Sequence, residues 1–158
     1  MQIDKIKTAG EIKQIAEKLK KDGKKIVTCN GCFDILHIGH IKFLKEAKEQ
    51  GDALIVGLNS DSSVKLNKGD RRPINDENSR AGVLAALGCV DYIVIFSEKD
   101  PRKVLEKIKP DIHVNGEEYG ENCIESAVVK KNGGKIYLIK KYGDFSTTNL
   151  IKRLCSNE

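Results

Sequence analysis

Five runs of consecutive apolar residues are spaced along the chain, and each is short enough to be a single strand. Within these runs the apolar residues follow one another directly rather than alternating with polar ones. This pattern is typical of strands that are buried on both faces, as in parallel sheets covered by helices. The sequence therefore predicts five buried strands, over residues 26–29, 52–59, 91–96, 111–114 and 135–139.

The segments between these runs carry helical signals. Thr8 and Glu11 have the spacing of a capping box, and apolar residues then recur at helical period until Gly23. Asp76 suits an N-cap, and Pro101 suits the first turn of a helix. The polar stretch 60–75 predicts a loop. Helices are predicted over residues 8–25, from near 37 to 47, and over 76–87, 101–108, 122–132 and 146–154.

Strands and helices that alternate in this way predict an α/β fold of the doubly wound, Rossmann-like type. The expected sheet is parallel and five-stranded, with helices on both faces. We expect a single domain over residues 1–158, with an N-terminal helix in 1–25 and a catalytic core in 26–154. Ligands of such folds bind at the carboxyl ends of the strands, where the strand order reverses. Functional residues are therefore expected directly after residues 29 and 114.

Composition narrows the class of protein. The 158 residues are 39% hydrophobic and 32% charged, which excludes strongly disordered classes. The formal charge of +5 fits a local phosphate site, whereas 5% aromatics and no Trp argue against a nucleic-acid-binding surface. No apolar run is long enough to span a membrane, and no secretory signal is visible, so a cytoplasmic protein with five free cysteines is expected.

Two of the three histidines follow the first predicted strand. His37 and His40 are three residues apart at the start of a helix, so their side chains share one face, and Gly39 between them permits close approach of a ligand. A helix N-terminus also offers unpaired N–H groups to an anion. Neither a Walker loop nor a G-x-G-x-x-G motif is present. This pattern predicts a phosphate site built on histidines.

The run Asn-Gly-Cys-Phe-Asp-Ile-Leu-His-Ile-Gly-His, residues 30–40, resembles the signature of the cytidylyltransferase-like nucleotidyltransferases. Later pieces agree in order, namely 59–61, 65–72, Arg80 and 146–148. The segment Lys-Gly-Asp-Arg-Arg-Pro-Ile-Asn at 68–75 is most similar to the adenylyltransferase domains of ADP-heptose synthases. The resemblance extends from about residue 26 to residue 154.

This resemblance implies transfer of AMP from ATP to a sugar 1-phosphate, D-glycero-β-D-manno-heptose 1-phosphate, with release of pyrophosphate. A phosphate nucleophile is already largely ionised at neutral pH, so catalysis rests on positioning and charge neutralisation. By resemblance, His37 and His40 stabilise charge at the α-phosphate, Lys65 approaches both substrates, and Arg80 completes the catalytic set. Mg²⁺ is expected to arrive with the triphosphate, and no metal site formed by the protein alone is expected.

The resemblance also implies two binding sets, and Asp34 within the first is an orienting or metal-side carboxylate. The nucleotide-binding set is Asn30, Gly31, Cys32, Phe33, Asp34, His37, Gly39, His40, Asn115, Gly116, Lys141, Ser146, Thr147 and Thr148. The acceptor-binding set is Lys65, Lys68, Arg71, Glu117 and Glu118.

Two positions depart from the family pattern. Asn-Gly-Glu-Glu-Tyr at 115–119 replaces a Lys-Gly-Gly-Asp-Tyr motif, and Lys141 replaces an arginine of the related cytidylyltransferases. Glu117 and Glu118 fit sugar hydroxyls better than a phosphate, because carboxylates accept hydrogen bonds and repel anions. The family resemblance also suggests a homodimer. Many relatives carry a fused sugar kinase, and none occurs in this sequence, so a kinase on a separate chain is expected.

Two alternatives stay open at this stage. The first is a cytidylyltransferase that uses CTP and glycerol 3-phosphate or another small phosphorylated acceptor, because it shares every motif quoted above. The second belongs to a different class. Cys29 and Cys32 form a C-x-x-C pair with His37 and His40 nearby, which is compatible with a redox or zinc module.

Overall fold

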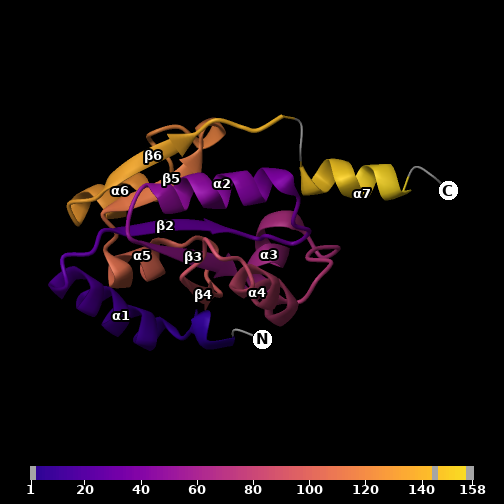
Figure 1. The fold of residues 1–158 in the computed structure, drawn as a ribbon. Helices are drawn as coiled ribbons and strands as arrows, with labels where there is room; N and C mark the ends of the chain where they lie inside the picture. Colours follow the sequence, from indigo (N-terminus) through magenta and orange to yellow (C-terminus); the bar gives the residue numbers. More distant parts are fainter. Residues whose placement is uncertain (1–2, 144–145, 156–158) are drawn as a thin grey trace.

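The computed structural model describes residues 3–143 and 146–155 and contains one parallel sheet between two layers of helices (Figure 1). The predicted domain of residues 1–158 thus includes seven residues that lie outside the described part, 1–2, 144–145 and 156–158. The strands are β1 (Ile6–Lys7), β2 (Ile26–Gly31), β3 (Ala53–Asn59), β4 (Tyr92–Phe96), β5 (Ile112–Gly116) and β6 (Lys135–Ile139). The α-helices are α1 (Ala9–Lys21), α2 (Ile38–Glu49), α3 (Asp61–Lys68), α4 (Glu77–Ala85), α5 (Arg102–Ile108), α6 (Ser126–Lys131) and α7 (Thr147–Cys155), with 3₁₀ turns at Ile3–Lys5 and Glu117–Tyr119.

The strand order is β1-β4-β3-β2-β5-β6, and all pairs are parallel. The chain runs from β2 through β3 to β4 in one direction and then returns to place β5 on the other side of β2. The order therefore reverses between β2 and β5, which is where a doubly wound sheet binds its ligand. The predicted fold class is confirmed.

The predicted strand number is wrong by one. The sheet has six strands because Ile6 and Lys7 pair with Ile93 and Val94 at its edge. A two-residue strand is too short to produce a recognisable apolar run, so the sequence pattern did not reveal it.

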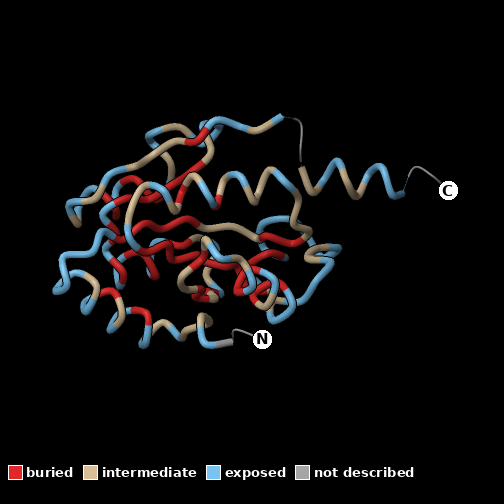
Figure 2. Tube along the Cα trace, viewed as in Figure 1, coloured by how far each residue is buried: buried red, intermediate tan, exposed pale blue. Residues whose placement is uncertain are grey.

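Each face of the sheet packs against its own helices (Figure 2). On one face, α2 and α4 bury Leu44 and Leu84 against Val27, Leu54 and Val56. On the other face, α1 and α5 pack on the opposite side chains of the same strands, and the buried cluster there is Ile12, Ala16, Ile26, Ile55, Val94, Phe96, Val104 and Ile108. Apolar side chains on both faces explain why the strands read as unbroken apolar runs.

Two predicted segments differ from the structure. The stretch 60–75 contains the helix α3, which Ser60 caps by accepting a hydrogen bond from the Ser63 N–H. This helix has little apolar periodicity, since Val64 is buried whereas Leu66 is 67% exposed. The segment 122–132 is helical only over α6. At the C-terminal end, α7 extends away from the body of the sheet (Figure 1).

Candidate active site

A cleft of about 380 Å³ opens at the carboxyl ends of β2 and β5. Its walls come from the β2–α2 loop, the start of α2, the end of β5, the segment after β6 and the start of α7. Every residue of the predicted nucleotide-binding set lines it, namely Asn30, Gly31, Cys32, Phe33, Asp34, His37, Gly39, His40, Asn115, Gly116, Lys141, Ser146, Thr147 and Thr148. The structure thus brings together segments that are more than a hundred residues apart in the chain.

His37 and His40 are stacked in this cleft. Their ring centroids lie 3.9 Å apart with an interplanar angle of 30°, because residues three apart share one face at the start of α2. The His37 N–H donates to Nδ1 of His40 at 3.4 Å. In the neutral tautomer this acceptor role leaves the proton on Nε2 of His40. The first turn of α2 therefore offers an imidazole N–H beside unpaired backbone N–H groups.

Both histidines are held in the neutral form. Burial lowers the pKa of His40 to about 4, with smaller contributions from His37 and from Lys68. Burial also lowers the pKa of His37. Two basic side chains, Lys68 and Arg72, line the same cleft. The cleft of the free protein thus combines neutral hydrogen-bond donors with fixed cations, which suits a polyanionic ligand.

Asp34 is engaged within the protein. Its carboxylate, 1% exposed, accepts hydrogen bonds from Arg72 Nε at 2.8 Å and from the N–H groups of Ile74 and Asn75. Burial opposes ionisation of Asp34, but these hydrogen bonds outweigh it and lower the pKa. The Asn75 side chain also donates to the backbone oxygen of Asp34. Asp34 therefore fastens the segment 72–75 to the β2–α2 loop instead of offering a free carboxylate to a metal.

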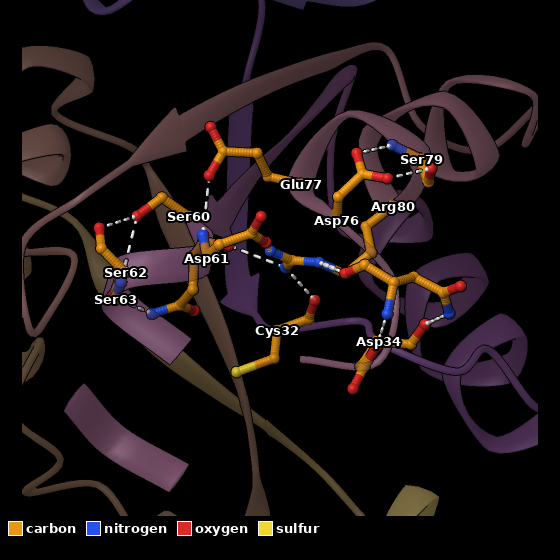
Figure 3. Close-up of polar contacts among 12 residues, drawn as sticks. Cys32, Asp34, Ser60, Asp61, Ser62, Ser63, Asp76, Glu77, Ser79 and Arg80 are labelled. Atoms are coloured by element: carbon orange, nitrogen blue, oxygen red, sulfur yellow. Dashed lines mark hydrogen bonds and ion pairs between the residues drawn. The ribbon is translucent and has the colours of Figure 1, made fainter. Parts of the chain in front are cut away.

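Arg80 lies outside the cleft, contrary to its predicted place among groups that touch substrate. It is 2% exposed and donates to the backbone oxygens of Cys32, Asn59 and Asn75 (Figure 3). Its second terminal nitrogen pairs with Asp61 at 2.7 Å. The geometry is that of a positioning residue, because one guanidinium joins the loop after β2, the end of β3 and the start of α3 to the segment preceding α4. Its signal in the sequence was the family motif, which does not distinguish contact from support.

The predicted acceptor-binding set divides in two. Lys68 and Glu118 line the cleft, and the Glu118 carboxylate folds back over Gly116. Lys65 on α3 and Arg71 after the end of α3 are both exposed, and neither lines the cleft. Glu117 also lies outside the lining and accepts a hydrogen bond from the Lys141 N–H at 3.4 Å. In this structure Lys65 is therefore not in position to contact a ligand.

Several lining residues were absent from the predicted set. Arg72 lines the cleft and neighbours the predicted Arg71 in the same motif, so the sequence signal lay one residue away. Tyr142 is placed by a hydrogen bond to Glu46 and by Lys42, whose ammonium lies 5.2 Å from its ring centroid. No sequence pattern identifies such partners. The remaining additional lining residues are Phe43, Tyr119, Ile139 and Lys140.

The C-x-x-C pair is split between two environments. Cys29 is buried among apolar side chains, where burial raises the pKa of its thiol, whereas Cys32 lines the cleft. Across residues 3–143 and 146–155, no group of three or more His, Cys, Asp or Glu side chains could hold a metal ion. Within the same residues no helix is long and apolar enough to cross a membrane.

Comparison with curated proteins places the chain among longer relatives. The bifunctional protein HldE of Aliarcobacter butzleri (strain RM4018) is 49% identical over 97% of this chain. The protein of the same name from Geobacter metallireducens is 47% identical over 95% of it. The matched regions cover 32% and 31% of those two proteins, so the chain spans about a third of the length of the curated relatives it matches.

Solved structures agree with this placement. The lipopolysaccharide core biosynthesis protein from Thermoplasma volcanium GSS1 matches with a TM-score of 0.61 and 36% identity, over 76% of this chain and 98% of that one. A pantoate-beta-alanine ligase from Francisella tularensis, complexed with beta-gamma ATP and beta-alanine, has a TM-score of 0.66 at 21% identity, over 92% of this chain and 72% of that one, and shows the shared fold alone. The cytidylyltransferase-like family model matches residues 28–153. With the cleft at the switch point and the paired histidines at the start of α2, the chain belongs to the cytidylyltransferase-like family.

Proposed function

We propose that this chain is an adenylyltransferase that joins AMP from ATP to D-glycero-β-D-manno-heptose 1-phosphate. A phosphate oxygen of the sugar attacks the α-phosphorus and forms a new P–O bond. The bond between the α-phosphorus and the bridging oxygen breaks, and pyrophosphate leaves. The observation that carries this proposal is the stacked pair His37 and His40 at the start of α2, inside a cleft with Lys68 and Arg72.

The chain's own residues supply charge stabilisation rather than a strong base. His40 can donate from Nε2 to an α-phosphate oxygen, where negative charge develops in the transition state. Lys68 and Arg72 lie in the same cleft and can neutralise the triphosphate. Ser146 and Thr147 at the start of α7 line the opposite wall, and Thr147 Oγ1 donates to the Ile35 oxygen, which joins that wall to the β2–α2 loop.

The heptose acceptor is supported by the segment 68–75, which resembles the heptose enzymes, and by the Thermoplasma relative, described as a lipopolysaccharide core biosynthesis protein. Glu118 in the cleft offers acceptor oxygens to sugar hydroxyls. We infer a polyhydroxylated acceptor from this carboxylate, because it would repel a bare phosphoester.

Mg²⁺ stays a proposal. A triphosphate provides oxygen ligands of its own, so we propose that the ion enters with ATP. Among the described residues, the carboxylates that line the cleft are those of Asp34 and Glu118. Asp34 is occupied by Arg72 and by backbone N–H groups, which leaves Glu118. These residues do not form a cage for the ion.

Partners of the whole protein also stay proposals. A kinase on a separate chain finds no support, because the relatives are named bifunctional proteins and are about three times as long as this chain. A homodimer and a cytoplasmic location stay predictions. Nucleic acid is not proposed as a partner, since the cleft residues suit a nucleotide and a sugar phosphate.

The competing readings make different predictions for one experiment. Pyrophosphate release is measured with each of four nucleoside triphosphates against heptose 1-phosphate, glycerol 3-phosphate and other sugar phosphates. The proposal expects release with ATP and heptose 1-phosphate. Release with CTP and glycerol 3-phosphate would favour the cytidylyltransferase. No release, together with stoichiometric zinc or a reactive Cys29–Cys32 pair, would favour the redox or zinc module.

A further inference from the structure

A cluster of buried polar side chains lies behind the cleft. In β5, Ile112 and Val114 point into the core shared with α2 and α4, so His113 and Asn115 point to the opposite face. Asn115 reaches the cleft at the end of this strand. Glu125, the N-cap residue of α6, approaches Asn115 from the same side. Asn115 belongs to the nucleotide-binding set that the family resemblance implies, whereas Glu125 belongs to neither set.

The contact between these two residues fixes an amide. Asn115 Nδ2 donates to Glu125 Oε2 at 3.2 Å, and the two residues are only 7% and 5% exposed. The Cys123 thiol also lies within hydrogen-bond reach of both side chains. The amide nitrogen is the donor in this contact, so it faces the Glu125 side chain. The amide oxygen of Asn115 is then left for the cleft.

A second amide lies beside the first. Asn30 is the last residue but one of the neighbouring strand β2 and lines the same cleft. Two residues earlier in each strand, Thr28 pairs with His113. Asn30 Oδ1 is buried and has no hydrogen-bond partner within residues 3–143 and 146–155. Buried polar atoms are rarely left unpaired. The amide oxygens of Asn30 and Asn115 thus lie near the ends of adjacent strands, and that of Asn30 lacks a hydrogen-bond donor among the described residues.

The neighbouring His113 does not form an ion pair with Glu125. His113 is fully buried, and its Nδ1 lies 2.8 Å from Thr28 Oγ1. Burial lowers the pKa of His113 to about 4, although Glu125 opposes this effect, so the ring is neutral at pH 7. Because the ring is neutral at pH 7, His113 gives Glu125 no ion-pair partner, and the Asn115 amide donates a hydrogen bond to the Glu125 side chain.

We propose that Glu125 is a positioning residue that orients the Asn115 amide so that its oxygen, with that of Asn30, accepts hydrogen bonds from donors on the bound nucleotide. This inference rests on the proposed function, since it assumes that the cleft holds ATP. The donor is either a ribose hydroxyl or the exocyclic amine of the base, and both present the same chemistry to an amide oxygen.

The test compares two isosteric substitutions in one segment. Glu125→Gln keeps the shape but gives the side chain its own N–H₂, which allows the Asn115 amide to flip. Glu121→Gln makes the same charge change at an exposed position and serves as control. Dissociation constants are measured by calorimetry for ATP, 2′-deoxy-ATP, 3′-deoxy-ATP and ITP, which lacks the exocyclic amine. Thermal unfolding reports the fold of each variant.

We expect Glu125→Gln to lower the affinity for ATP about tenfold and Glu121→Gln to leave it unchanged. For the one analogue that lacks the recognised donor, Glu125→Gln should bind as tightly as the wild type does. Asn115→Ala should weaken ATP binding equally, and the double variant should be no weaker than Asn115→Ala alone. A merely structural role would lower thermal stability without changing discrimination among nucleotides.

Two results would overturn the inference. The first is ATP affinity in Glu125→Gln within about twofold of Glu121→Gln, and the second is unchanged discrimination among the analogues. If Glu125→Gln fails to fold, Glu125→Asp, which withdraws the carboxylate by one methylene, is measured in its place. A wild-type chain that binds ATP but releases no pyrophosphate contradicts the proposed function, while the affinities still decide the role of Glu125.

Discussion

Arg72 Nε and the Asp34 carboxylate form an ion pair of 2.8 Å that joins two walls of the cleft. Asp34 belongs to the loop after β2, and Arg72 belongs to the segment between α3 and α4. The pair is nearly enclosed, with side-chain exposures of 1% for Asp34 and 13% for Arg72. Together with the N–H groups of Ile74 and Asn75, it holds the segment 72–75 against the loop that carries the histidines.

Asp34→Asn should release this segment. The amide cannot accept all the N–H donors that the carboxylate accepts, and it leaves the Arg72 guanidinium without its counter-charge. Breaking a buried pair costs about 3–5 kcal/mol. We expect a loss of that order in the free energy of unfolding by denaturant, and faster hydrogen exchange at the amides of Ile74 and Asn75.

Asp70→Asn is the matched control, since Asp70 is exposed in the same connection. Surface substitutions of this kind change stability by about 0.5 kcal/mol or less. Equal stabilities for the two variants would show that the contact between Asp34 and Arg72 does not hold the segment.

His37→Ala and His40→Ala should each lower kcat by at least about a hundredfold, because each removes a preorganised donor at the developing charge. Pyrophosphate release gives kcat, and circular dichroism with thermal unfolding reports the fold. Activity near that of the wild type in either variant, with the fold intact, would remove that histidine from the reaction.

Lys68→Ala should weaken ATP binding more than Lys65→Ala does. Lys68 lines the cleft, whereas Lys65 is exposed one turn earlier on α3 and outside the lining. Loss of a charge-assisted hydrogen bond predicts about a tenfold increase in KM for ATP in Lys68→Ala. An effect of Lys65→Ala that exceeds that of Lys68→Ala would mean that α3 moves towards the cleft during turnover.

Stability should fall as the pH is lowered from about 6.5 to about 4. Burial lowers the pKa of His40 and of His113 to about 4, below the usual value near 6.5. Between these values the unfolded chain binds protons that the native chain does not, so acid favours unfolding. Each histidine contributes a loss on the order of 2–3 kcal/mol across that window, measured as the free energy of unfolding against pH.

His113→Asn isolates one of the two contributions. Asparagine keeps a polar atom for Thr28 and does not titrate in this range. The slope of stability against pH between about 4 and 6.5 should decrease in this variant. An unchanged slope would show that His113 takes up its proton without cost in the folded protein.

The sequence predicted the fold and most of the cleft for a simple physical reason. Strands buried on both faces are continuous apolar runs, and the polar residues that interrupt them at Asn30 and Asn115 mark the edge where a doubly wound sheet binds ligands. The motif that starts α2 predicted a site at His37 and His40, and both residues line the cleft. At the strand ends and at the start of α2, the local sequence pattern alone indicates where the residue lies in the fold.

Sequence reasoning failed where long-range contacts decide the role of a side chain. Arg80 and Arg72 carry the same functional group, but Arg80 is buried and donates hydrogen bonds to three backbone oxygens, whereas Arg72 lines the cleft. Glu125 carries no recognisable motif, and its contact with Asn115 depends on how the chain folds back from β5 to α6. Such partners are set by the packing of whole elements, which no local spacing records.

The most direct test of the proposed reaction is the ratio of kcat/KM for ATP to that for CTP, with heptose 1-phosphate as acceptor and the product identified by mass. We predict ADP-heptose as product and a ratio of about ten or more in favour of ATP, which corresponds to about 1.4 kcal/mol of transition-state binding. A ratio of about ten in favour of CTP, or transfer to glycerol 3-phosphate but not to the sugar phosphate, would contradict the proposal.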